Sequence, residues 1–521
     1  MRSGGGRVVG ETSELVQTEH PHISTTPCLT VRLTAALIMN HTPILGLISV
    51  LLAAGVASAA VSVGQEKGVW WFRSPTGEPF LSIGANHVEP VYWQSPRNED
   101  FVRETYGGEV FRKDGTFDDD SAAVKKWTFR VAANFKDWGF NTLGFHNPLS
   151  HSLQEAIGGY YVCHLPIAVS WGWNMKRAEL VRHFAKRPMD LFDERFRAEL
   201  DEVSDQLVKP RAQDPRLLGY AFTDGPPWTV DDDASSAAFA NLTPAQKQLH
   251  PWVHALMSLP ATAAGKQAWI AFLQKRHAEP AKAAAVYAVK ATTWNELADC
   301  TQWNELGDRD AAGADSRAFL SILMRRWYEE RAASIRKHDS KHLILGDKLN
   351  MNRDRKFPVQ LANSLRQMRG FVDVISVQYY APADEQVATL ANVHRESGLP
   401  IINGDTTCKP IWPDSAISGE NPEFYQALGQ AYDETLTKLF AQPWFIGWHH
   451  CGYMRGLRQP YLAALKKGDT KESAAFERRG TLYREGFIDD HEQPIEPILT
   501  PLKAAIAKCD GLHRSSGGVK P

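Results

Sequence analysis

Several patterns that mark common protein classes are missing from this 521-residue chain. Lysine and arginine total 58 and aspartate and glutamate 60, so the net charge of −2 gives no electrostatic basis for binding nucleic acid or an anionic membrane. The six cysteines include no CxxC pair, which excludes a disulfide scaffold and a zinc pattern. Most of the five beyond the leader should be buried thiols, with one or two disulfides as the alternative. No glycine-rich phosphate loop occurs, so we predict no cofactor.

Long apolar runs are also scarce, and the one present lies near the N-terminus. Pro43–Val61 is almost uncharged and ends in the small-residue pattern Ala57-Ser58-Ala59, as in a secretory signal peptide. We therefore predict a signal peptide at 39–59 that starts at Met39, a non-native or disordered extension at 1–38, and a secreted or periplasmic protein. An uncleaved anchor is the alternative, because the run is near the length that spans a bilayer.

From about residue 68 onward, short apolar runs alternate with longer amphipathic stretches, which predicts βαβ units around a parallel sheet. The runs are Phe80–His87, Thr142–His146, Tyr161–Val169, Leu217–Asp224, His342–Asp347, Val372–Gln378, Leu399–Asp405 and Trp444–His450. Eight is the number that closes a (β/α)8 TIM barrel, which we predict over residues 68–510. A doubly wound open sheet is the alternative, but its usual glycine-rich first turn is missing.

Helical patterns lie between these runs. They are Ala122–Trp138, Asp193–Gln206, Asp315–His338, Asn363–Arg369, Ala383–Ser397, Pro422–Ala441 and Pro501–Lys508. The link between the fourth and fifth strands is much longer than the others and holds an alanine-rich stretch at Pro244–Ala291. We interpret residues 229–313 as a helical insertion in a strand-to-helix loop rather than as a separate domain.

Polar and aromatic side chains stand where the predicted strands end. They are Asn86, His87, His146, Asn147, His164, Asp224, Asp347, Gln378, Tyr379, Tyr380, Asp405, Trp448, His449 and His450. Active sites of this barrel lie at the carboxyl ends of the strands, so this ring predicts a small-molecule site. A turn or helix-cap role is the alternative for any single member, and Asp347 fits it well.

Two aspartates of the ring suggest a reaction. Glycoside hydrolysis needs one carboxylic acid to protonate the leaving oxygen and a second carboxylate to attack the anomeric carbon or activate water. Asp224 and Asp405 follow the fourth and seventh strands and are our candidates for the two groups. The 16 tryptophans also suit sugar binding, and Trp448 and Trp228 are the candidate contacts, with core packing as the alternative.

Short motifs across residues 68–508 resemble clan A glycoside hydrolases, and their order most resembles the agarase-like proteins of glycoside hydrolase family 50. These motifs are Trp138–Thr142 (WGFNT), Leu217–Trp228 (LLGYAFTDGPPW), Leu399–Asp405, Trp444–His449 and Gly486–Asp490 (GFIDD). The resemblance implies that Asp224 is the acid/base and Asp405 the nucleophile or base, where the clan usually has glutamate. It also implies that Tyr379 or Tyr380 orients Asp405.

The aspartates depart from the clan pattern. Each side chain is one methylene shorter than glutamate, so the choice between retention and inversion of configuration stays open. Two Asn-Glu pairs of the expected kind, Asn295-Glu296 and Asn304-Glu305, lie in the polar insertion rather than after an apolar strand. We interpret both pairs as coincidental; the alternative is that a loop glutamate folds back over the barrel mouth and replaces the missing one.

The sequence thus predicts a secreted glycoside hydrolase that cleaves β-glycosidic bonds in a polysaccharide or its oligosaccharides. Further substrate contacts would come from His87, His146, Asn147, Gln378 and His449. A non-catalytic carbohydrate-binding barrel is one alternative. A metal-dependent hydrolase that uses the His/Asp ring is another, but beyond the leader no HxH or HExxH spacing supports it, and we predict no metal site.

Overall fold

The computed structural model describes most of the chain after residue 59. The described residues are 60–89, 98–107, 121–147, 150–165, 189–226, 228, 243–354, 358–408, 422–457, 464–465, 467–479, 482–483 and 486–518. They belong to one compact unit, Val56–Pro521. The predicted extension and signal peptide, residues 1–59, lie outside the described residues, as does Cys28.

Eight parallel strands close into a barrel in chain order, and the last strand pairs with the first. They are β4 (Ser82–Ala85), β5 (Thr142–Leu143), β6 (Tyr160–His164), β7 (Leu217–Asp224), β8 (Leu343–Asn350), β9 (Ile375–Gln378), β10 (Ile401–Thr406) and β11 (Phe445–His450). Each of the eight predicted runs overlaps one of these strands. The (β/α)8 barrel is therefore confirmed and the open sheet is excluded.

A small antiparallel sheet precedes the barrel and was not predicted. It contains β1 (Ser62–Glu66), β2 (Val69–Arg73) and β3 (Pro79–Phe80). Lys67 and Gly68 join β1 to β2 with φ angles of 52° and 83°, as a tight two-residue hairpin turn requires. The first predicted strand, Phe80–His87, is wrong at its start, because Phe80 pairs with Phe72 of β2 and the barrel strand begins at Ser82.

Helices surround the barrel strands and fill the links between them. They are α1 (Glu99–Tyr106), α2 (Ala122–Trp138), α3 (His151–Ile157), α5 (Glu194–Val203), α7 (Pro244–Gln248), α8 (Pro251–Met257), α9 (Ala264–His277), α10 (Pro280–Val286), α11 (Trp294–Asp299), α12 (Arg309–Arg336), α13 (Met351–Asp354), α14 (Pro358–Met368), α15 (Ala383–Ser397), α16 (Pro422–Phe440), α18 (Thr470–Arg479) and α19 (Glu496–Ser515). A short hairpin, β12 (Gly456–Leu457) with β13 (Leu482–Tyr483), lies near the C-terminus. Among the described residues, no helix combines the length and apolar character needed to cross a bilayer.

Helix α2 shows how the local sequence sets these elements. The Ser121 side chain accepts a hydrogen bond from the Val124 amide at its start, and Gly139 ends it in a left-handed conformation. Its buried residues recur at helical spacing and face the core, as Trp127, Val131 and Phe135 do. Helix α2 and its strand β5 thus follow from the sequence pattern alone.

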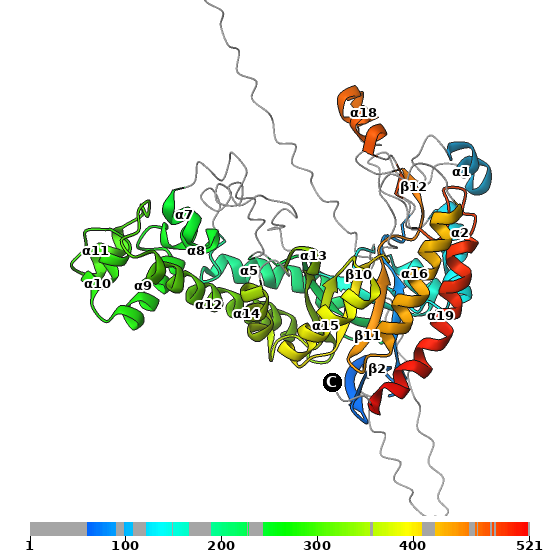
Figure 1. Cartoon of the computed structure of the whole chain (residues 1–521), viewed down its shortest axis with the longest axis horizontal. Helices are drawn as coiled ribbons and strands as arrows, with labels where there is room; N and C mark the ends of the chain where they lie inside the picture. The colour runs from blue at the N-terminus through cyan, green and yellow to red at the C-terminus, as the bar shows by residue number, and fades with distance from the viewer. Residues whose placement is uncertain are drawn as a thin grey trace, which may run out of the picture. The chain divides into compact units, whose positions relative to one another are not determined.

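Between β7 and β8 the chain forms α7 to α11 and then the long α12. In Figure 1, α9, α10 and α11 lie together on one side, away from α16 and α19, which run side by side. Trp228 and Trp252 stack with ring centroids 6.5 Å apart, and Trp327 of α12 packs edge-on against both. This aromatic core attaches the first helices of the link to the barrel wall.

All five cysteines of the described chain are free thiols. Cys163, Cys408 and Cys509 are buried, and Cys300 and Cys451 are partly buried. Burial raises the pKa of the Cys163 and Cys509 thiols to about 12, so both stay protonated and inert at neutral pH. These two cysteines act as small apolar core residues.

Candidate active site at the carboxyl ends of the barrel strands

Asp405, near the end of β10, is the centre of a dense polar network. Its Oδ2 atom accepts hydrogen bonds from the Lys348 ammonium and, at 3.0 Å, from the Gln378 amide. Its Oδ1 atom accepts a longer bond of 3.2 Å from the Tyr380 hydroxyl. The His146 Nε2 atom lies 3.5 Å from Oδ2. The network around Asp405 therefore gathers side chains from three neighbouring strands, β8, β9 and β10, and from the turn after β5.

The network keeps Asp405 ionised. Burial alone raises the pKa of this carboxyl, because water no longer stabilises its charge. Lys348, His146 and Cys451 together outweigh that effect, with Lys348 contributing most, and hold the Asp405 pKa well below its ordinary value. Asp405 is therefore an anion throughout the neutral range and cannot serve as a proton donor there.

Lys348 is a member of this network that the sequence analysis did not name. Its side chain is fully buried, bonds to Asp405 and lies 2.6 Å from His146 Nε2. The ammonium also sits 4.7 Å from the centroid of the Phe145 ring, a favourable cation–π contact. The predicted fifth strand stopped at Asp347, whereas β8 continues to Asn350.

His87 and His146 form a stacked pair beside this network. Their rings are 4.8 Å apart and inclined by 10°. His87 holds a left-handed backbone conformation with φ of 51°, which is uncommon outside glycine and asparagine. The His87 side chain is about one-third exposed, and its Nδ1 atom lies 3.9 Å from Glu89. The two predicted contacts therefore extend the network from buried Asp405 toward solvent.

His449 lies inside the barrel rather than at its rim. Its ring is fully buried, and Nε2 is 2.8 Å from the Ser82 hydroxyl. Burial lowers its pKa to about 4, so His449 is neutral at physiological pH. The Nδ1 atom has no hydrogen-bond partner among the described residues. His449 is placed to support the floor of the site.

Two predicted contacts face away from the mouth. Trp448 is fully buried and packs edge-on at 5.7 Å against Tyr432 of α16, on the helix side of the barrel wall. Tyr379 is also buried, and its hydroxyl bonds to Glu385 at 2.8 Å on α15. For Trp448 the core-packing alternative describes the geometry, and of the two tyrosines it is Tyr380 that reaches Asp405.

Two more candidates hold local structure. Asn147 shapes the turn after β5, since its amide donates to the Ala85 carbonyl at 2.7 Å and its oxygen accepts from the Val88 amide. Trp228 is 2% exposed within the aromatic core beside α12. Neither side chain joins the Asp405 network in the described contacts.

Asp224 and Asp347 flank Lys348 in different ways. Asp224 ends β7, and its backbone is in register with Lys348 of β8, while its side chain lies outside the described part of the structure. Asp347 points to the opposite side of β8 from Lys348. It accepts hydrogen bonds from the Thr223 hydroxyl at 2.6 Å and the Trp327 indole at 3.0 Å. Asp347 therefore has a structural role, as a buried acceptor rather than as the turn or cap residue we expected.

The two Asn-Glu pairs of the insertion lie on exposed surface. Glu296 completes a capping box at the start of α11, since its carboxylate accepts from the Thr293 amide while its own amide donates to the Thr293 hydroxyl. Asn304 and Glu305 are both exposed and follow α11. The local geometry accounts for Glu296 without any catalytic role.

The described His, Cys, Asp and Glu side chains include one group close enough to share a cation. It consists of Asp489, Asp490 and His491 in the C-terminal tail. The described members of the predicted His/Asp ring form no such group. The geometry at Asp405 is that of a carboxylate held by an ammonium, not that of a set of metal ligands.

Comparison with solved structures places the fold among known barrels. An exo-beta-agarase matches with a TM-score of 0.62 and 14% identity, covering 88% of this chain and 66% of that chain. The agarase AgWH50C matches with a TM-score of 0.61 and 15% identity, covering 88% and 66%. BpGH50 matches with a TM-score of 0.53 and 13% identity, covering 88% and 84%.

The chain spans about two thirds of the length of these two agarases. No family model matches the sequence, and no curated protein is significantly similar to it. The resemblance inferred from the short motifs is therefore confirmed at the level of the fold: this chain has the barrel of the agarase structures.

Proposed function

We propose that this chain is an agarase-like glycoside hydrolase that cleaves β-glycosidic bonds in a polysaccharide or its oligosaccharides. One observation carries the proposal. A buried, ionised carboxylate, Asp405, stands at the end of the seventh strand of a barrel shared with agarase structures over 88% of this chain. Glycosidases use one ionised carboxylate as nucleophile or as base toward water.

The two aspartates would have different roles. Asp405 has a pKa far too low for an acid, so it would act as nucleophile or as base toward water. Its Oδ2 atom is anchored by Lys348 and Gln378, which leaves Oδ1, with its longer bond to Tyr380, as the reacting oxygen. Asp224 would protonate the leaving oxygen and later deprotonate water in a retaining pathway.

The supporting groups would act through Asp405. Tyr380 would orient the Asp405 carboxylate. Lys348 would stabilise the negative charge of that carboxylate before attack, and it would stabilise the neutral ester formed by attack less well. This difference would help to return the carboxylate to its ionised form in the second half of a retaining reaction. His146 and His87 extend from this point to the exposed side and would bind sugar hydroxyls.

Product analysis on a panel of algal and plant polysaccharides tests the function. We expect oligosaccharide release by the native chain and a loss of about 10³-fold or more for Asp224→Asn and for Asp405→Asn. Asp384→Asn is the matched control, because Asp384 is an exposed carboxylate paired with Lys438. Proton NMR of the first product shows whether the anomer is retained or inverted. Activity that survives both site substitutions would refute the assignment.

A second candidate is a non-catalytic carbohydrate-binding barrel. It is favoured by the donors that already surround the Asp405 carboxylate in the described structure. Equilibrium binding to the same panel distinguishes the two candidates, since this one gives saturable binding with no product.

We also propose that the chain is exported after cleavage behind Ala59. The small-residue pattern Ala57-Ser58-Ala59 supports this proposal. Mass spectrometry of the protein recovered from the periplasm or medium should give a mature N-terminus at Ala60. Recovery of the intact chain in the membrane fraction would favour an anchor instead.

A further inference from the structure

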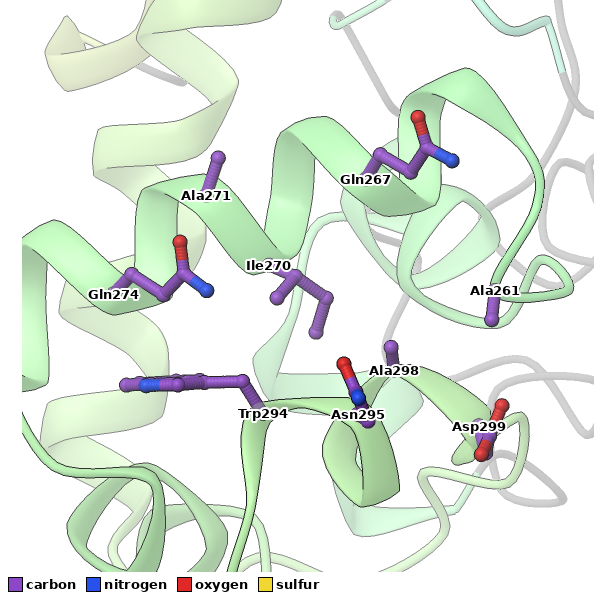
Figure 2. A pocket seen from close by; sticks show the side chains of 9 residues that line it. All are labelled: Ala261, Gln267, Ile270, Ala271, Gln274, Trp294, Asn295, Ala298 and Asp299. Atoms are coloured by element: carbon purple, nitrogen blue, oxygen red, sulfur yellow. The ribbon is translucent and has the colours of Figure 1, made fainter.

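A cavity lies outside the Asp405 network, in the link between β7 and β8. Helices α9 and α11 border it, and its volume is about 500 Å³ (Figure 2). It is lined by Ala261, Gln267, Ile270, Ala271, Gln274, Trp294, Asn295, Ala298 and Asp299. Pockets that bind small ligands fall in the range of ~300–1,000 Å³, so the space is large enough for a sugar unit.

Trp294 supplies an aromatic wall. In Figure 2 its indole is seen edge-on, with one face turned toward Ile270 and Gln274 of α9 across the cavity. The ring is partly buried and packs on the hydrophobic core, so it is held in place rather than loose on the surface. A fixed aromatic face can cover the apolar C–H face of a pyranose ring.

Amide side chains supply the polar part of the lining. Gln274 points from α9 toward Trp294, and Asn295 points from α11 toward α9 (Figure 2). Both are exposed, and neither makes a side-chain hydrogen bond within the described part of the chain. An amide offers both donors and an acceptor, which suits a sugar hydroxyl that also does both.

The lining is held in position before any ligand arrives. Trp294 and Asn295 are the first two residues of α11, whose start is fixed by the capping box between Thr293 and Glu296. Ile270 and Gln274 lie four residues apart on α9, so they share one face of that helix. A preformed wall lowers the entropy lost on binding.

Charge narrows the class of ligand. The nine lining residues include one carboxylate, Asp299, and no lysine, arginine or histidine. A sulfated or uronic acid sugar would face that negative charge with no cation among the lining residues, whereas a neutral sugar would meet no repulsion. The lining therefore favours an uncharged oligosaccharide.

We propose that the cavity between α9 and α11 is a secondary binding site for neutral oligosaccharide chains, distinct from the barrel mouth. The ligand class follows from the lining itself, and only the choice of an agarose-derived probe rests on the proposed function. Such a site would hold a polymer on the protein while the barrel acts on another part of it.

Calorimetric titration of the full chain tests the proposal. The probe is a neutral hexasaccharide from agarose, and the Asp405→Asn background prevents cleavage. We expect Trp294→Ala to weaken one class of site about tenfold, Gln274→Ala to weaken it less, and a sulfated galactan hexasaccharide to leave that site empty. Phe129→Ala is the matched control, since Phe129 is a 70% exposed aromatic residue on α2.

The outcomes separate this proposal from the proposed function. Because Gln274 is exposed, its substitution should leave the thermal unfolding midpoint unchanged even if Trp294→Ala lowers it. With native Asp405, Trp294→Ala should not change kcat/KM on a short soluble substrate. If the native chain does not cleave the agarose probe and the Asp405→Asn chain does not bind it, the proposed function fails. Neutral xylan and mannan hexasaccharides then test the cavity on its own. Binding that is equal in Trp294→Ala, Gln274→Ala and Phe129→Ala for every neutral probe would overturn the proposal.

Discussion

Replacing Lys348 by methionine removes the one ammonium that faces Asp405 in the described contacts. The side chain is fully buried and methionine is close to it in length, so the main change is electrostatic. Loss of one partner from a buried ion pair typically costs about 3–5 kcal/mol, because the other charge stays in a poor solvent. We expect Lys348→Met to lower the free energy of unfolding by that amount near pH 7.

The pH dependence gives a sharper test. In the native chain the depressed Asp405 pKa contributes stability above the unfolded pKa of about 3.8, and this contribution is lost as the pH falls through the folded value. Without Lys348, burial raises the folded pKa of Asp405 above the unfolded value. The buried Asp405 carboxyl then stabilises the fold only while it is protonated, and this stability is lost as the pH rises from about 3.8 through the folded pKa. Lys348→Met should therefore recover part of its loss in mild acid.

Urea unfolding of a double-mutant cycle measures the coupling. Lys348→Met/Asp405→Asn removes both charges and should regain most of the stability that Lys348→Met loses, with a coupling of about 2–3 kcal/mol. Lys266→Met is the control, since that buried lysine donates to the Met257 and Cys300 carbonyls rather than to a carboxylate. Losses that add within about 0.5 kcal/mol would refute the ion-pair interpretation.

Two further predictions concern pH and the insertion. Burial lowers the pKa of His449 to about 4 from 6.5, so the unfolded chain binds more protons between these values and stability should fall as the pH drops from about 6.5 to 4. His449→Gln should reduce that slope by up to about 1.4 kcal/mol per pH unit in urea titrations, and an unchanged slope would show that this ring does not titrate differently in the two states. Glu296→Ala should remove the Glu296 half of the α11 capping box at a cost of up to about 1 kcal/mol and leave kcat unchanged on a short substrate; a large loss of kcat would instead make its Asn-Glu pair part of the active site.

The barrel was predictable because its strands are short apolar runs that end on polar groups. Helices α2 and α15 have the bounds that their amphipathic patterns gave, since each ends at a glycine in a left-handed conformation. The hairpin at Lys67 and Gly68 was missed because strands were sought only from about residue 68 onward. The GFIDD tail resembled the clan, and its Phe487 proves to be a core residue packed 4.3 Å from His450.

The direction of each side chain was harder to predict. Barrel strands are buried on both faces, so polar and apolar residues do not alternate along them, and position along the sequence does not say which side faces the interior. Tyr379 and Tyr380 were therefore equivalent before the structure, as were Trp448 and His449. Lys348 was hidden for a related reason, because a strand interior is the place where a lysine is least expected.

Neighbouring Asp347 and Lys348 make β8 intolerant of slippage. One residue sends its carboxylate outward to Thr223 and Trp327, and the next sends its ammonium inward to Asp405. A shift of β8 by one position would exchange the two environments and strand both charges in unsuitable surroundings, a penalty of several kcal/mol for each. Purely apolar strands could close a barrel in more than one hydrogen-bond register. The opposite charges of Asp347 and Lys348 favour one register for β8, and thereby one shear for the barrel.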